Sequence, residues 1–339
     1  MKKIIILILA LFLAFGCLGA ETKPTNTSTG EQKPITININ NQTNQPTITN
    51  ETAPTEPIDP VENPINNSVD PRYVEEPSVP FAIYFIDASD STTHANAVLV
   101  KKGDFDLLID AASEGRSGKV IDFLRSKNVD DIEVLVSTNA DPRNYGGISR
   151  VLDTYEVENF WVGEESSNND YSRIVDKAEN EARKSYRVYR GFEKEYNGIK
   201  FEVLNPDKDR PFGDVNNDGV IIKVTNGNFS ALLLGSAQTG VQGRLLNEEE
   251  GKIVDIPVIQ APYYGVGAGT SNIGIYLNKA KPKDVIISGS GTENAVMGGS
   301  RDPFRRLLNQ YHIQYYETYR NGSIKVISNG LDYAVERDG

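Results

Sequence analysis

The chain has little cysteine, little histidine and no surplus of basic residues, and each shortage argues against a class of function. One cysteine in 339 residues, Cys17, leaves no partner for a disulfide within the chain. Ser236 lies outside a Gly-x-Ser-x-Gly elbow, and the only histidines, His94 and His312, give it no obvious general base for hydrolysis. The formal net charge of -12 gives no support to a nucleic-acid partner held through clustered lysine and arginine, although charge alone does not exclude one.

The N-terminus carries an unbroken apolar run. Residues 4–15 are apolar, follow Lys2-Lys3 and end at Gly16-Cys17. This length suits the core of a signal peptide and is too short to span a bilayer. A small residue directly before a cysteine resembles a lipobox, although Phe15 stands where a small residue is commoner. We therefore expect residues 1–20 to be a signal peptide whose Cys17 is lipidated.

Two other interpretations of residues 1–20 remain open. Cys17 would be discarded if the segment is an ordinary export signal, and the segment would be retained if it is an uncleaved anchor. With lipidation or an uncleaved signal, the rest of the chain is extracytoplasmic and anchored to the cell membrane.

Residues 21–75 are rich in threonine, asparagine, proline, glutamine and serine, with almost no large apolar side chain. Such a segment buries too little surface to offset the entropy of ordering, so we expect a disordered linker. It carries acceptor sequons for N-glycosylation at Asn26, Asn41, Asn50 and Asn66.

From residue 76 to 339 the pattern changes to short β-branched runs that alternate with amphipathic stretches. We expect strands at 82–87, 97–100, 105–110, 132–137, 160–162, 200–204, 220–224, 229–234, 254–260 and 285–288. We expect helices at 118–127, 171–183, 272–280 and 303–311. Asn226-Gly227 predicts a hairpin turn, and Asn321-Gly322 predicts another at the C-terminus. Each half runs strands, helix, strand, which favours one domain of mixed α/β class, a four-layer αββα sandwich.

The stretch VLVSTNADPRNYGGI, residues 134–148, starts as a buried strand and then presents a polar cluster before two glycines. The carboxyl end of a strand in a layered α/β fold is where functional residues gather. The alternative is an ordinary loop that begins at Asp141-Pro142 and ends at Gly146-Gly147.

Six segments together resemble the metallo-β-lactamase fold, and most closely the hydrolase-like domain of the ComEC competence proteins. In order they are AIYFIDASDS, LLIDAAS, VLVSTNADPRNYGGI, DVNNDGVIIKV, ALLLGSAQ and VIQAPYYGVGAGTS. The resemblance covers residues 81–326 and implies a dinuclear zinc site at the end of the strand at 132–137.

The implied zinc ligands are missing from this sequence. The family's His-x-His-x-Asp-His positions hold Asn139, Asp141, Arg143 and Asn144. Ser236 stands at the bridging aspartate, and Tyr263-Tyr264 replace a His-His pair. Zinc needs neutral imidazoles and carboxylates, and Arg143 puts a permanent cation where a carboxylate faces the metal, so no zinc cofactor is expected.

We expect Arg143 to pair with Asp87, Asp110 or Asp141, so that charge-assisted hydrogen bonds replace metal–ligand bonds. Asp87 and Asp110 are retained from the family pattern and end core strands.

A calcium loop is the other candidate metal site. Asp214, Asn216 and Asp218 occupy positions 1, 3 and 5 of an EF-hand-like pattern. Thr225 stands where the pattern needs a bidentate glutamate, and the flanks predict strands. The alternative is a simple loop before a strand.

These observations predict a non-catalytic binding or scaffolding pseudoenzyme at the cell surface. Its partner would be a small anionic ligand or a cell-surface protein, bound in a groove lined by Asp87, Asp110, Asn139, Asp141, Arg143, Asn144, Ser236, Tyr263 and Tyr264. The alternative is a ComEC-like hydrolase, phosphodiesterase or nuclease that holds a hard cation through Asp87, Asp110, Asn139 and Asp141. A purely structural envelope protein is a third possibility.

Overall fold

The computed structural model describes residues 79–90, 93–163, 166–267, 270, 273–290 and 300–338. The predicted signal peptide, the lipidation site Cys17, the predicted linker and its four sequons lie outside these residues. Within the described part of the chain, no helix is long and apolar enough to cross a bilayer.

The first half of the domain opens with three antiparallel strands and continues with alternating helices and parallel strands. Its elements are β1 (Phe81–Phe85), β2 (Val98–Lys102), β3 (Phe105–Ile109), η1 (Glu114–Arg116), α1 (Ser117–Ser126), β4 (Ile132–Ser137), α2 (Pro142–Tyr145), α3 (Ile148–Leu152), β5 (Val157–Val162), α4 (Asn169–Glu181) and β6 (Lys184–Arg187).

The second half repeats this order and adds a C-terminal hairpin. Its elements are β7 (Glu193–Tyr196), β8 (Ile199–Asn205), β9 (Ile221–Asn226), β10 (Phe229–Leu233), α5 (Thr239–Glu248), α6 (Glu250–Ile253), β11 (Val258–Gln260), η2 (Pro262–Gly265), α7 (Ile273–Ala280), β12 (Asp284–Ile287), α8 (Asp302–Gln310), β13 (Gln314–Glu317), α9 (Thr318–Asn321), β14 (Ser323–Ser328) and β15 (Tyr333–Asp338).

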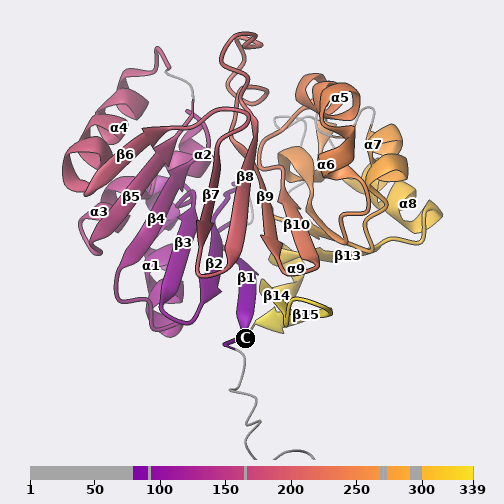
Figure 1. The fold of residues 1–339 in the computed structure, drawn as a ribbon, viewed down its shortest axis with the longest axis horizontal. Coiled ribbons are helices and arrows are strands. Elements are labelled where there is room, and N and C mark those ends of the chain that lie inside the picture. Colours follow the sequence, from indigo (N-terminus) through magenta and orange to yellow (C-terminus); the bar gives the residue numbers. More distant parts are fainter. Residues whose placement is uncertain are drawn as a thin grey trace, which may run out of the picture. The chain divides into compact units, whose positions relative to one another are not determined.

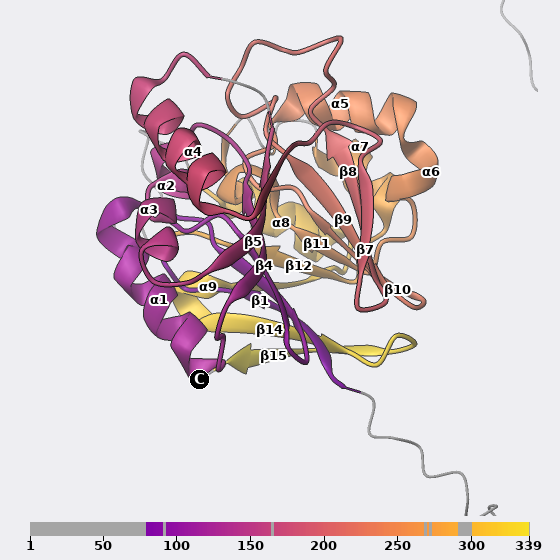
Figure 2. The same cartoon turned by 60° about the vertical axis from the view of Figure 1, so that its left-hand side comes forward.

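The strands form two sheets that pack face to face. The first has the order β15-β14-β1-β2-β3-β4-β5-β6 and the second the order β13-β12-β11-β10-β9-β8-β7. Helices α1, α3 and α4 cover the outer face of the first sheet, and α5 to α8 cover the outer face of the second (Figure 1, Figure 2). The predicted four-layer αββα sandwich is therefore confirmed.

Strand β4 is covered on both faces, which accounts for the apolar residues in its middle. Val134 and Val136 pack between the two sheets, whereas Leu135 packs against the helices of the first half. A strand covered on both faces gains from apolar residues on both, so residues 134–136 form a continuous apolar run between Glu133 and Ser137.

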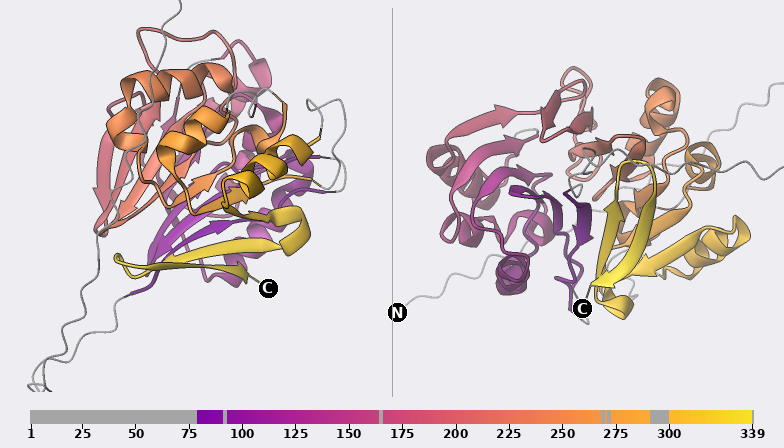
Figure 3. Two further views of the ribbon diagram at one scale, coloured as in Figure 1. Left: turned by 90° about the vertical axis from the view of Figure 1, so that its right-hand side faces the viewer. Right: turned by 60° about the horizontal axis from the view of Figure 1, so that its bottom comes forward.

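The C-terminal hairpin differs from the prediction. Asn321-Gly322, the expected turn, lies instead at the end of α9, where the chain passes from the second sheet to the first. The hairpin turns at residues 329–332, where the Asn329 side chain accepts hydrogen bonds from two backbone N–H groups. Because β14 pairs with all of β1, the first strand of the domain and its C-terminal hairpin are neighbours in the first sheet (Figure 3).

Three other strands also differ from the prediction. Strand β11 begins at Val258 and not at residue 254, because Asp255 takes a φ of 54° and Pro257 has no N–H to donate to a sheet. The edge strands β6 and β7 were not expected, since their exposed charged residues show no apolar pattern.

Tyr333 links the C-terminal hairpin to the second sheet, and its hydroxyl donates a 2.6 Å hydrogen bond to the Asp284 carboxylate. We expect Tyr333→Phe to lower the free energy of unfolding by about 1 kcal/mol, because the half-buried carboxylate loses its donor. Urea denaturation measures this change.

Tyr319→Phe is the control. Tyr319 is 47% exposed, so loss of its hydroxyl is expected to change stability by less than about 0.5 kcal/mol. Equal effects of the two variants would show that the hairpin does not depend on the Asp284 contact.

Candidate functional site

Asp110, directly after β3, is the most deeply buried carboxylate at the strand ends. It is fully buried and accepts hydrogen bonds from Asn96 Nδ2 (2.8 Å), from the backbone N–H of Thr138 (2.9 Å) and from Thr138 Oγ1 (2.7 Å). Burial raises the pKa of Asp110 to about 6, although these three donors favour the ionised form. Its acceptor sites are largely used by the protein itself.

An amide chain connects this carboxylate to the second sheet. Asn96, which donates to Asp110, accepts a 2.7 Å hydrogen bond from Gln260 Nε2 at the end of β11. Gln260 Oε1 in turn accepts from the backbone N–H of Gly235 (3.0 Å). The sequence analysis did not identify Asn96 or Gln260 as site residues. For Gln260 a signal was available, because it is a polar residue at the end of an apolar strand.

Asp141 begins the short helix α2 and pairs with Arg143. One carboxylate oxygen accepts from the backbone N–H of Arg143 (2.9 Å), and Arg143 Nε lies 2.8 and 3.0 Å from the two oxygens. Arg143 Nη2 also contacts the carboxylate. Asp141 is therefore the partner of Arg143 among the three aspartates that the sequence proposed. Burial opposes the guanidinium charge, but the hydrogen bonds from Arg143 to Asp141 outweigh it and raise the pKa of Arg143.

The glycine pair after α2 allows this turn to lie against the preceding loop. A Cβ at Gly147 would collide with the carbonyl oxygen of Ala111, and a Cβ at Gly146 would collide with the backbone at Glu114. Close approach of the backbone therefore accounts for both glycines.

Tyr264 fills the space beside the Asp141–Arg143 pair. Its ring stacks on His94 with centroids 4.8 Å apart, and Arg143 Cζ lies 5.5 Å from its centroid. Its hydroxyl donates to Asn144 Oδ1 at 2.9 Å. Tyr263 and Tyr264 both have positive φ, 46° and 58°, a strained conformation that surrounding contacts must hold.

Asn144 joins the two halves of the site. Its side-chain amide donates to Asn139 Oδ1 (2.8 Å) and to Ser236 Oγ (3.0 Å), and its oxygen accepts from Tyr264. Ser236 and Tyr264 belong to the second half of the chain. We call this set the polar cluster: Asp110, Thr138, Asn139, Asp141, Arg143, Asn144, Ser236 and Tyr264.

Seven of the nine residues predicted to line a groove therefore belong to one bonded cluster, and two do not. Asp87 lies apart: its backbone N–H donates to Ser323 Oγ and its carboxylate lies 4.0 Å from Lys119. Tyr263 is partly exposed, with its ring 5.9 Å from that of Tyr264. Most members of the polar cluster are buried and bonded to one another, so they form a filled floor and not an open groove.

The two histidines occupy very different places. His94 is buried, and its Nδ1 accepts hydrogen bonds from the Ser290 backbone N–H (2.9 Å) and from Arg301 Nη2 (3.0 Å). His312 is exposed after α8. Burial is the main cause that lowers the pKa of His94 to about 4, and the positive charges of Arg301 and Arg143 lower it further.

A pocket of about 320 Å³ opens beside Asn139. Its walls are the residues that follow β4 (Thr138, Asn139 and Ala140), two serines before α4, and part of the loop at residues 211–218 between β8 and β9. A larger hollow of about 970 Å³ lies among the outer helices and includes none of the nine predicted residues. The pocket beside Asn139 is thus the candidate binding site.

The residues do not fit the zinc site that the sequence resemblance implies. Among the described residues, no three histidine, cysteine, aspartate or glutamate side chains converge as a cation site. Asp110 already accepts three hydrogen bonds from protein donors, Asp141 is held by Arg143, and Asp87 lies apart. The same geometry counts against the alternative cation held by Asp87, Asp110, Asn139 and Asp141.

The calcium-loop residues also have internal partners. Asp214 accepts hydrogen bonds from the N–H groups of Asn216 (3.1 Å) and Asn217 (2.8 Å). Asp218 accepts from the N–H groups of Phe212 (2.8 Å) and Asp214 (3.1 Å). This turn bonding explains the residue pattern without a cation.

Solved structures show what this arrangement is similar to. The metallo-beta-lactamase fold protein YhfI from Bacillus subtilis has a TM-score of 0.50 and 10% identity, covering 73% of this chain and 99% of that one. A metallo hydrolase from the archaeon Ignicoccus hospitalis has a TM-score of 0.46 and 11% identity, covering 73% and 98%. The diiron beta-hydroxylase CmlA from Streptomyces venezuelae has a TM-score of 0.48 and 10% identity, covering 78% of this chain and 55% of that one.

The chain therefore has the metallo-β-lactamase fold. No family model matches the sequence, and no curated protein matches it either. At 10% identity the likeness to YhfI, with its TM-score of 0.50, supports the fold alone and leaves activity to be argued from the site.

The Asp141–Arg143 pair can be tested by truncation. The two side chains are 7% and 22% exposed, so Arg143→Ala leaves a buried carboxylate without its partner. We expect the free energy of unfolding to fall by about 2 to 3 kcal/mol. Urea denaturation at pH 7 measures the loss.

Arg173→Ala provides the matched control. Arg173 pairs with Asp170 three residues earlier, but these side chains are 76% and 71% exposed. Its loss should cost less than about 0.5 kcal/mol. If Arg143→Ala proves as mild as this control, the pair does not hold the site together.

The pKa of His94 gives a pH prediction. Because the folded-state pKa is about 4 against 6.5 for the free side chain, the unfolded chain binds the proton first as pH falls. The stability contributed by neutral His94 is present above about pH 6.5 and is lost toward pH 4. We expect the stability advantage of the wild type over His94→Phe to shrink between pH 7 and 4.5, as measured by urea denaturation. A constant difference across this range would contradict the assignment.

Proposed function

We propose that this chain is an exported, membrane-tethered protein of the metallo-β-lactamase fold that binds or scaffolds a cell-surface partner without catalysing a reaction. One observation carries the proposal: the Asp141–Arg143 pair and Tyr264 take the positions at which the family resemblance places metal ligands. Residues that would have to bind and activate water are instead bonded to one another.

The Arg143 guanidinium explains why this arrangement opposes metal-dependent hydrolysis. A metal entering beside Asp141 would have to displace a guanidinium that already makes charge-assisted hydrogen bonds to the carboxylate. It would also come close to the Arg143 cation and to the buried Tyr264 ring. The side chains at the positions of the family's metal ligands therefore favour a metal-free pseudoenzyme.

The pocket beside Asn139 supports a binding role. It lies next to the polar cluster and is not filled by it, so a ligand there need not break the internal hydrogen bonds of the cluster. Its floor residue Asn139 is fixed by hydrogen bonds to Asn144 and to the Val215 carbonyl oxygen (3.2 Å). A pre-formed pocket binds with little ordering cost.

The strand directions agree with a tether at residues 1–75. Strands β1, β3 and β4 run parallel to one another, so the chain enters β1 at the end of the sheet opposite to Asp110 and Thr138. A lipid on Cys17, or an uncleaved signal, followed by the linker would then join the domain at the end of the sheet away from Asp110 and Thr138, so the tether would not enter the site.

The proposal is tested by metal content and hydrolysis. The full chain, purified without chelators and dialysed against zinc, manganese, magnesium and calcium, is expected to contain less than one metal per ten chains by mass spectrometry. It should not cleave bis(p-nitrophenyl) phosphate or single-stranded DNA above buffer.

Asp141→Asn is the control variant for the opposite result. One metal per chain together with cleavage, both lost in Asp141→Asn, would overturn the proposal in favour of a ComEC-like metal-dependent hydrolase or nuclease. Cleavage that persists in the variant would identify a contaminating enzyme and leave the proposal standing.

A further inference from the structure

The charges of the pocket beside Asn139 are negative only. Its lining includes the carboxylates Asp214 and Asp218, and no lysine or arginine of the described chain lines it. The nearby Arg143 is neutralised by Asp141. The sequence pointed to an anionic ligand because of Arg143, but the pocket itself favours a cation.

The rest of the pocket wall is largely apolar or uncharged. Ala140, Pro211 and Val215 contribute carbon surface, and the volume of about 320 Å³ suits one long side chain more than a folded partner. Lysine and arginine combine an aliphatic stem with a charged head, which matches carbon walls leading to a carboxylate.

Asp214 has an oxygen available to such a head group. Its Oδ1 accepts from two backbone N–H groups of the turn, whereas no described residue donates to its Oδ2. Asp214 is exposed at the pocket rim. The turn therefore fixes the carboxylate by one oxygen and leaves the other directed to a ligand or solvent.

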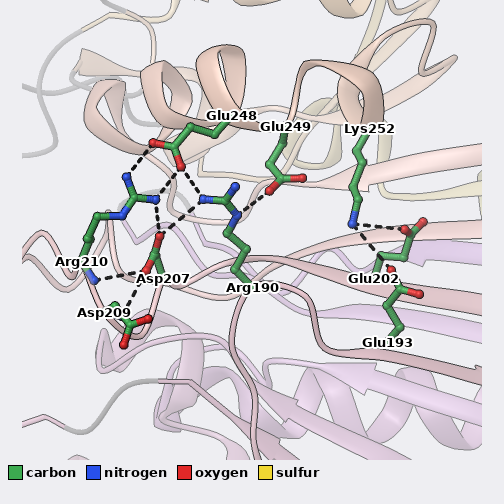
Figure 4. Close-up of polar contacts among 9 residues, drawn as sticks. All are labelled: Arg190, Glu193, Glu202, Asp207, Asp209, Arg210, Glu248, Glu249 and Lys252. Carbon is green, nitrogen blue, oxygen red and sulfur yellow. Dashed lines mark hydrogen bonds and ion pairs between the residues drawn. The ribbon is translucent and has the colours of Figure 1, made fainter.

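The loop that carries Asp214 is joined to α5 at its base by ion pairs (Figure 4). Arg210 bonds both Asp207 (2.6 Å) and Glu248 of α5 (2.9 and 2.6 Å), and Arg190 contacts Asp207, Glu248 and Glu249. These contacts join the loop to α5 and make the pocket wall pre-formed.

The outer part of the same loop is fixed against α5 as well. The Arg244 guanidinium lies 3.8 Å from the Phe212 ring centroid, and Asn217 Oδ1 accepts from the Val241 N–H at 3.2 Å. Phe212 and Val215 are nevertheless 38% and 44% exposed. Phe212 and Val215 thus leave carbon surface beside the pocket that is available to a partner polypeptide.

We propose that this pocket takes up a lysine or arginine side chain of an extended partner polypeptide, with its stem on Ala140, Pro211 and Val215 and its head on Asp214. The inference rests on the proposed function and specifies the partner of that binding site. Phe212 contacts the partner chain next to the bound side chain.

The probe is a fluorescein-labelled peptide, Gly-Ala-Arg-Ala-Gly, and its analogue with neutral citrulline in place of arginine. Fluorescence anisotropy with the full chain should show binding at least about tenfold tighter for the arginine peptide, because a charge-assisted hydrogen bond is lost in the analogue. Asp214→Asn should abolish this preference while keeping the Oδ1 acceptor of the turn.

Asp209→Asn is the matched control, since it removes the same charge from the same loop at a residue that does not line the pocket. It should retain the preference for the arginine peptide. Equal binding of the two peptides, or equal losses in the Asp214 and Asp209 variants, would overturn the inference.

Metal content and phosphodiester cleavage on the same preparation separate the two proposals. A metal-free, inactive chain without peptide preference would refute the cation pocket and leave the non-catalytic assignment intact. Metal-dependent cleavage would refute the proposed function and, with it, the inference.

Discussion

A partly buried arginine beside the carboxyl ends of parallel strands needs a carboxylate, and Asp141 supplies one through its own turn. The same carboxylate accepts the backbone N–H of Arg143, so the helix start and the ion pair form together. Because Arg143 is fixed in this way, Tyr264 can pack on its guanidinium and bond to Asn144. The filled floor of the site depends on this pair.

Hydrogen bonds in the polar cluster and beside it join halves of the chain that are distant in sequence. Asn144 bonds Ser236 and Tyr264, and Asn96 bonds Gln260. The family resemblance implies that metal ions would join the two halves in a zinc-binding member. In this chain, side-chain amides and hydroxyls join them. Low local polarity makes each of these bonds costly to break, because a lost partner leaves a buried polar group unsatisfied. Asp110 and Tyr264 have positive φ angles, a strained backbone conformation that these buried hydrogen bonds hold in place.

Most of the fold could be predicted from the sequence, since β4, β8 and α1 carry strong local patterns. The site was predicted only in part. Asp141, Arg143 and Asn144 lie close together in sequence, so their role was visible. His94 and Asn96 reach the site through tertiary contacts that no local pattern records, and Gln260 gave only the weak signal of a polar residue that ends an apolar strand. The C-terminal hairpin was misplaced because Asn321-Gly322 is a turn signal that the fold uses to change sheets.

A crystal structure of the full chain grown with excess zinc tests the central claim most directly. The account predicts that Arg143 stays bonded to Asp141, that Tyr264 stays stacked on His94, and that no anomalous zinc signal lies between Asp110 and Asp141. A zinc ion bound by these two aspartates, with Arg143 turned outward, would contradict it.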